Sequence, residues 1–210
     1  VDFTVGDPPY QKWQRGRGMY RSNGAAVAFS LRSKAARDRG AAPDLYVMAL
    51  VTRFFGYFTG YSDIIRESRA DLTFALLKAH TNNRGGRVSL FSADPRDPPE
   101  IDFCGFEEGT DASGEDLDAV VEGVQRVRRM TARIRGLLAP EDTPGADCDD
   151  PGRLKEFVRR HAWGHHASCT CPIGLKEDGG VLTSDFRVHG TEGLRVVDAS
   201  VFPRIPGFFI

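Results

Sequence analysis

The sequence predicts an α+β fold in which a mostly antiparallel sheet is flanked by helices. Short runs rich in β-branched and aromatic residues, separated by Gly, Pro and Asn, follow one another along the chain and are typical of strands. Two longer segments instead repeat apolar residues at helical spacing. Because the strands are largely consecutive, we expect them to pair antiparallel.

Turn-forming residues bound the strand candidates. Residues 43–51 place β-formers and apolar residues between a proline and a glycine-containing loop. Residues 22–29 carry small side chains and fit either a strand or a loop packed against a partner. The strands that we expect are 43–51, 72–79, 87–91 and 100–103, with three short strands, 181–183, 186–189 and 194–197, near the end of the chain.

An aromatic stretch, residues 54–61, alternates bulky rings with glycine. Two interpretations stay open. The stretch is a buried loop that fills the core, or it lines a substrate cavity. Its rings belong to Phe54, Phe55, Tyr57, Phe58 and Tyr61.

Capping patterns mark the two helices. Ser113, with Asp116 three residues further on, has the pattern of an N-terminal cap, and the helix should run to Gly136. Asp150 followed by Pro151 opens the second helix. The apolar face of the first helix is formed by Leu117, Val120, Val121, Val124, Val127, Thr131 and Ile134.

Composition excludes several classes of protein. The chain has 210 residues, 40% of them hydrophobic, and a formal net charge of −1, so it does not resemble a nucleic-acid binder that neutralises phosphates. No apolar run approaches the roughly 20 residues of a membrane span. Four cysteines without disulfide-type spacing indicate a reduced, cytoplasmic setting. Because the chain begins at Val1 and stops on the apolar run 206–210, we expect a fragment of a longer protein.

Imidazoles and thiols gather after the second helix. Adjacent histidines and a Cys-x-Cys pair fit the usual zinc geometries poorly, so we expect no metal. A cysteine nucleophile and a histidine general base are the other chemical interpretations, and imidazole is well suited to take and return a hydroxyl proton near neutral pH. A purely structural histidine also fits. The side chains concerned are His161, His165, His166, Cys169 and Cys171.

A second informative segment lies near the end of the chain. Residues 194–197 predict a buried strand that ends on Asp198, Ala199 and Ser200. A small-residue turn at a strand end lets a ligand approach the backbone closely. Residues 16–21 lack the third glycine of a dinucleotide-binding loop, so any nucleotide-type cofactor needs a domain that this chain does not carry.

These motifs resemble the carboxy-terminal part of the glucose-methanol-choline (GMC) family of flavin-dependent oxidoreductases. The His-x-x-Cys-Thr of residues 166–170, with Ile-Gly at 173–174, is similar to the family's His-x-x-Gly/Cys-Thr motif. Residues 194–203 are similar to its Leu-Arg-Val-Val-Asp-Ala/Gly-Ser-x-x-Pro segment. Residues 83–102 and 116–124 are similar to the family's entry into this region and to the helix that follows.

The resemblance implies roles for individual residues. His166 would be the base that takes the alcohol proton, with His165 as a substrate contact. Asp198 and Ala199 would lie against FAD. The family's second active-site residue, a His or Asn, follows the proline of the Asp-Ala-Ser segment by several residues, and residues 205–210 contain neither.

The resemblance also implies a domain organisation. Residues 1–172 would be a portion of the substrate-binding domain. Residues 173–210 would be the carboxy-terminal segment of the FAD-binding domain, with a final strand returning to a flavin domain whose amino-terminal, Rossmann-like part is missing. That missing half would be the chain's partner, and nucleic acid and a membrane span are not expected.

The function implied is that of an FAD-dependent oxidoreductase that acts on the CH–OH group of a small-molecule alcohol by hydride transfer to the flavin. An oxidase and a dehydrogenase both fit. The fragment alone is expected to be a poor enzyme. The alternative is a non-catalytic remnant, or a small-molecule binding module that works without flavin.

Overall fold

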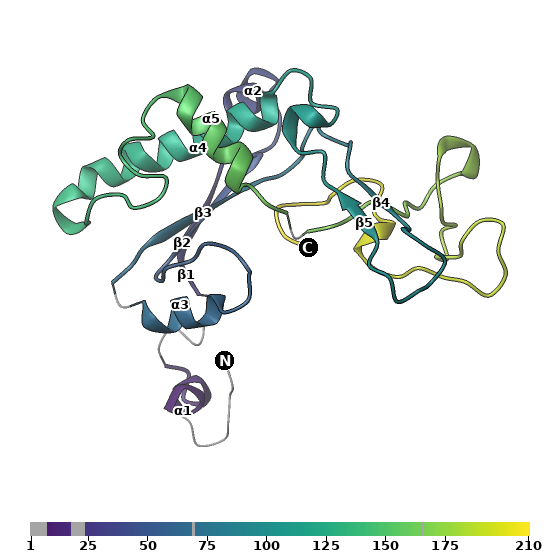
Figure 1. The fold of residues 1–210 in the computed structure, drawn as a ribbon, viewed down its shortest axis with the longest axis horizontal. Coiled ribbons are helices and arrows are strands. Elements are labelled where there is room, and N and C mark those ends of the chain that lie inside the picture. Colours follow the sequence, from purple (N-terminus) through teal and green to yellow (C-terminus); the bar gives the residue numbers. More distant parts are fainter. Residues whose placement is uncertain (1–7, 18–23, 69, 165) are drawn as a thin grey trace.

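A three-stranded antiparallel sheet lies at the centre of the molecule (Figure 1). The computed structural model describes residues 8–17, 24–68, 70–164 and 166–210. The sheet has the order β1–β2–β3, and a separate antiparallel ribbon pairs β4 with β5. The strands are β1 (Ala25–Leu31), β2 (Leu45–Leu50), β3 (Thr73–Lys78), β4 (Arg87–Ser89) and β5 (Glu100–Asp102). The predicted α+β class and its antiparallel pairing are confirmed.

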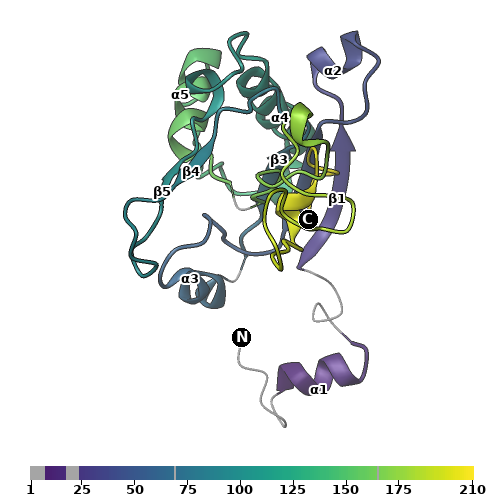
Figure 2. The ribbon, with the colours of Figure 1, turned by 90° about the vertical axis from the view of Figure 1, so that its right-hand side faces the viewer.

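Helices cover one face of the sheet and its surroundings. Helix α4 packs on strands β2 and β3 and α5 packs beside α4, whereas α1 projects away from the rest (Figures 1 and 2). The helices are α1 (Pro8–Gln14), α2 (Lys34–Asp38), α3 (Tyr61–Glu67), α4 (Glu115–Thr131) and α5 (Pro151–His161). Among the described residues, no helix is long and apolar enough to cross a membrane.

Alternating burial along β2 determines which face α4 covers. Leu45, Val47 and Ala49 are buried, and their neighbours are half-buried. Helix α4 approaches this face closely at Gly123, where a Cβ atom would lie 2.6 Å from Cδ2 of Leu76. A side chain at this position would force Leu76 to shift, so glycine favours this close approach of the helix to the sheet.

A second apolar cluster joins α4 to α5. Leu117 and Val121 of α4 meet Leu154 and Val158 of α5, and all four are buried. The helical spacing of apolar residues places them on facing sides of the two helices. This cluster fixes the end of α5, from which the histidine-rich segment departs.

Buried charges tie β2 and β3 to α4. Lys78 Nζ lies 3.5 Å from a carboxylate oxygen of Asp44 and 3.2 Å from one of Asp116, and all three side chains are nearly inaccessible to solvent. Asp44 also accepts hydrogen bonds from the amide and hydroxyl of Ser33, each 2.7 Å long. Charges buried in this way need such partners.

One predicted helix cap is confirmed and the other is wrong. Asp150 caps α5 by accepting from the amides of Gly152 and Arg153 at 2.8 and 3.0 Å. For α4 the N-cap is Gly114, in the left-handed region with φ 69°, instead of Ser113. The amide of Asp116 donates to the carboxylate of Asp111 at 2.8 Å.

The strands expected near the chain's end are also wrong. Residues 181–183, 186–189 and 194–197 form single bridges, Leu182↔Val188 and Arg187↔Arg195, with no extended ladder. Gly190 and Gly193, both with positive φ, make the turn between the second and third of these segments. The segment 194–197 is thus irregular, and no final strand forms here.

Candidate functional site

A large cleft of about 3250 Å³ runs along β3, the aromatic stretch, the ends of α4 and α5, and residues 166–170 and 203–209. Pockets for small ligands usually measure about 300–1,000 Å³. Strand β3 is an outer strand among those that the structure describes. The cleft as a whole is therefore larger than a small ligand, which would fill only part of it.

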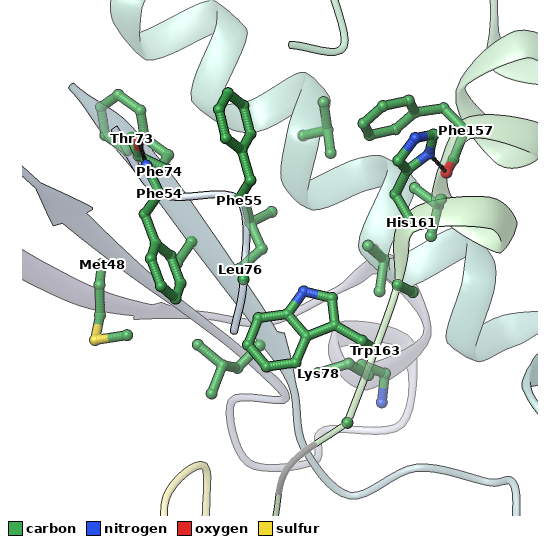
Figure 3. Close-up of a pocket in the computed structure, with 18 of the residues that line it drawn as sticks. Met48, Phe54, Phe55, Thr73, Phe74, Leu76, Lys78, Phe157, His161 and Trp163 are labelled. Atoms are coloured by element: carbon green, nitrogen blue, oxygen red, sulfur yellow. Dashed lines mark hydrogen bonds between the residues drawn. The ribbon is translucent and has the colours of Figure 1, made fainter. Parts of the chain in front are cut away.

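The aromatic stretch forms one wall of this cleft (Figure 3). The ring of Trp163 lies 6.4 Å from that of Phe54 and 5.6 Å from that of Tyr57. Gly56, with φ 111°, lies so close to the indole that a Cβ atom at this position would be 3.3 Å from Cε2 of Trp163. Phe55 is 48% exposed, so the buried-loop interpretation is wrong. The other interpretation, that residues 54–61 line a substrate cavity, stays a prediction.

His161 ends α5 at the rim of the same cleft (Figure 3). Its ring stacks on Phe157 with centroids 4.3 Å apart, and its Nδ1 lies 2.9 Å from the carbonyl oxygen of Phe157. Both contacts are local to the last turn of the helix. The imidazole is held back against its own helix.

His166 contacts a different aromatic ring from His161. It is half-buried, lines the cleft, and meets the ring of Phe209 edge to face, with centroids 4.8 Å apart. Its neighbour His165 lies outside the described residues. The structure therefore describes one of the two adjacent histidines.

Main-chain hydrogen bonds bring the two sequence motifs together. The amides of Cys169, Cys171 and Ile173 donate to the carbonyls of residues 199, 200 and 201 at 3.3, 2.9 and 3.0 Å. These carbonyls belong to a short 3₁₀ helix, Ala199–Val201. The histidine-bearing turn is thus fixed against the Asp-Ala-Ser turn through backbone atoms.

Asp198 opens that 3₁₀ helix as its N-cap. Its carboxylate accepts from the amide of Ser200 at 2.8 Å, and hydrogen bonding from Ser200 holds the pKa of Asp198 below its ordinary value. Asp198 is exposed and Ala199 half-buried, and neither lines the cleft that contains His166. The turn offers an anionic, small-residue surface outside that cleft.

The thiols and metal-ligand candidates do not converge. Cys169 and Cys171 are half-buried free cysteines, and Cys169 donates to the hydroxyl of Ser168 at 3.3 Å. In the part of the chain that the structure describes, no three His, Cys, Asp or Glu side chains lie where they could hold a metal ion.

Sequence reasoning missed the aromatic residues around His166. Phe208 stacks on Tyr46 of β2 at 5.3 Å, and Phe209 meets the same ring at 5.9 Å. The sequence shows a Phe-Phe pair after Pro-Gly, but within the apolar run 206–210 nothing indicates that these rings contact His166 or Tyr46.

The fold and the joined motifs define a class: an α+β module whose histidine-bearing turn is fixed to an Asp-Ala-Ser turn. A family model described as GMC oxidoreductase matches residues 81–209. The chain belongs to the GMC oxidoreductase family, a family of oxidoreductases.

Relatives and solved structures agree with this assignment. An oxygen-dependent choline dehydrogenase of Burkholderia lata is 42% identical over 123 residues, which are 57% of this chain and 21% of that protein. A formate oxidase of Aspergillus oryzae, studied for its FAD modification, aligns with TM-score 0.72 and 20% identity over 98% of this chain and 39% of its own. A fungal aryl-alcohol oxidase aligns with TM-score 0.51 and 27% identity over 79% of this chain and 24% of its own. The match spans about a fifth of the length of the curated relatives.

Proposed function

We propose that this chain is the substrate-domain and carboxy-terminal part of an FAD-dependent oxidoreductase that oxidises the CH–OH group of an alcohol, with His166 as the base. In this proposal residues 1–172 contribute to the substrate-binding domain, and residues 173–210 are the carboxy-terminal segment of the FAD-binding domain. The names of the relatives, a choline dehydrogenase and an aryl-alcohol oxidase, support an alcohol as substrate. An oxidase and a dehydrogenase are equally compatible with these residues.

The observation that carries the proposal is the backbone connection between the two motifs. Three amides of residues 169–173 bond to three consecutive carbonyls of residues 199–201. His166 lies three residues before the first of these bonds. A base held in this way keeps a fixed distance from whatever binds at the Asp-Ala-Ser turn, which is what a proton transfer coupled to oxidation requires.

The residues at the Asp-Ala-Ser turn fit a flavin cofactor. Ala199 presents a small side chain, and the neighbouring Val197, although apolar, is 71% exposed. An apolar surface next to a small-residue turn is suited to contact with a bound group. We propose Asp198 and Ala199 as cofactor contacts. When bound, FAD supplies the hydride acceptor that the oxidation of an alcohol needs.

His166 supplies the proton chemistry. Neutral imidazole accepts the hydroxyl proton as the alcohol carbon is oxidised, and water or a later step takes the proton away. Its half-buried position in the cleft lets the ring reach a bound alcohol while protein covers part of it. His165 is proposed as a substrate contact on its place in the sequence alone.

Replacing the base tests the proposal. In the full-length flavoprotein that contains this chain, His166→Ala should lower the rate of flavin reduction by an alcohol at least ~100-fold, the scale of a lost general base. Stopped-flow absorbance of the flavin measures this rate. His161→Ala is the matched control, because His161 bonds to its own helix, and it should reduce flavin within about threefold of the wild-type rate. Equal rates for His166→Ala and the wild type would remove His166 from the mechanism.

The large cleft favours one alternative function. A module that binds an apolar small molecule without flavin would also use a wide cleft with an aromatic wall. The visible spectrum of the purified full-length protein distinguishes the two functions. A flavin band supports the oxidoreductase, whereas a protein that stays colourless after incubation with FAD and desalting supports the binding module.

A further inference from the structure

The aromatic ring beside His166 belongs to the chain's own carboxy-terminal segment. The imidazole and the phenyl ring of Phe209 have centroids 4.8 Å apart and planes inclined by 77°. This edge-to-face arrangement is the favourable one for aromatic rings. It restricts how far the imidazole can tilt or rotate without losing the contact.

The segment that carries Phe209 is itself held on the sheet. Phe208 stacks on Tyr46 with centroids 5.3 Å apart and planes inclined by 30°, and Phe209 meets Tyr46 at 5.9 Å and 82°. Tyr46 alternates with the β2 residues that face α4, so it lies on the opposite face of the sheet. Phe209 therefore touches a rigid strand on one side and His166 on the other.

We propose that Phe209 is a positioning residue for His166, an inference that rests on the proposed function. Its ring transmits the fixed position of β2 to the imidazole. A phenyl ring has neither a hydrogen-bond donor nor an acceptor. The proton that His166 accepts from the alcohol oxygen thus stays on the imidazole and is not shared with the side chain at 209.

The size of the effect follows from the demands of proton transfer. The base must lie within hydrogen-bond reach of the hydroxyl, about 2.6–3.2 Å between heavy atoms. A displacement of about 1 Å can cost on the order of 100-fold in rate. Because positioning acts on the reactive complex, the loss of Phe209 should lower kcat and leave KM nearly unchanged.

Three variants of the full-length holoenzyme test this role. Phe209→Leu keeps an apolar side chain but removes the ring, and it should lower kcat by about 10- to 100-fold with KM within about threefold. Phe209→Tyr keeps the ring and should restore kcat to within about threefold. The matched control is Phe202→Leu, which removes a ring of the same carboxy-terminal segment that does not line the cleft, and it should lower kcat less than threefold. Phe209 is 48% exposed, so these changes should leave the protein folded, which its Tm checks.

A readout independent of turnover accompanies the kinetics. With ring-labelled histidine, the imidazole signal of His166, assigned with His166→Gln, should shift in Phe209→Leu and stay in place in Phe202→Leu. Equal kinetic losses for the two Phe→Leu variants, or an unmoved His166 signal in Phe209→Leu, would overturn the role of Phe209. A His166→Ala variant with wild-type flavin reduction would instead overturn the proposed function, so the two failures are distinguishable.

Discussion

The α4–α5 helix pair and the segment 166–210 hold their shapes by different means. The helix pair is joined by buried apolar side chains, with Leu117 and Leu154 fully inaccessible to solvent. In residues 166–210, all of which the structure describes, Leu182 and Val201 are the buried apolar residues. That segment depends on main-chain hydrogen bonds such as those from residues 169–173 to residues 199–201.

The difference explains where chemistry can be placed. Side chains that pack a core cannot also contact a substrate, because their surfaces are already covered by neighbouring side chains. When the backbone holds a turn, its side chains are available for binding. The candidate base and the candidate cofactor contacts all lie in the segment that the backbone holds.

The largest effect should come from breaking the helix pair. Leu154→Ala removes a fully buried side chain between α4 and α5, and it should lower the free energy of unfolding by about 2–5 kcal/mol. Urea unfolding followed by circular dichroism measures it. Leu137→Ala is the control, because Leu137 is 84% exposed, and it should change stability by less than about 0.5 kcal/mol. Similar losses in the two variants would refute the cluster as the main source of stability.

An intermediate effect should come from Asp111, whose carboxylate accepts from an amide in the first turn of α4. Burial alone would raise the pKa of Asp111, but hydrogen bonds from Asp116, Ser113 and Asn82 lower it below its ordinary value of 3.8. A lowered folded-state pKa gives stability that is present above pH 3.8 and is lost as the pH falls through the folded value.

Asp111→Asn should therefore cost about 1–3 kcal/mol at pH 7. Unfolding by urea at pH 7 and at stepwise lower pH gives the comparison with the wild type. The difference between the two proteins should shrink only below about pH 4. A difference that stays constant down to about pH 2 would show that the charge of Asp111 contributes nothing.

The smallest effect should come from the backbone conformation of the turn at residues 169–171. Cys169 has φ 71°, a left-handed conformation that glycine adopts without strain, whereas Cys171 has no positive φ. Cys169→Gly should leave the free energy of unfolding within about 0.5 kcal/mol of the wild type, and Cys171→Gly should lower it by about 1 kcal/mol. Differential scanning calorimetry compares the two. The reverse order would mean that side-chain packing, and not backbone conformation, governs this turn.

The sequence predicts the parts of the fold that local chemistry determines. Strand β2 is bounded by Pro43 and alternates in burial, and Asp150 caps α5 with Pro151 at its first turn. The start of α4 differs from the prediction, because the carboxylate of Asp111 reaches the amide of Asp116 around the left-handed Gly114. Because a residue that caps a helix through such a turn lies at no fixed number of positions before the helix, the sequence pattern does not identify it.

In the candidate site, too, the sequence predicts some features, and others appear only in the structure. The resemblance singles out His166 and the Asp-Ala-Ser turn, but bonds between main-chain atoms have no residue signature, so their connection appears only in the structure. The sequence does not single out Phe209, because residues 205–210 contain neither the His nor the Asn expected there. The segment 194–197 has the composition of a strand, yet its residues form one bridge.

The amides of alternate residues, 169, 171 and 173, donate to the carbonyls of residues 199–201. An insertion or deletion should therefore disturb the fold between 169 and 173 but be tolerated elsewhere in the segment. An amino acid inserted between 169 and 173 would turn a bonded amide outward and rotate everything before it, His166 included. Residues 175–181 form an excursion that is closed at its base by the hydrogen bond from the amide of Gly174 to the carbonyl of Leu182. A change of length within that excursion would therefore alter the rim of the molecule while the histidine keeps its place.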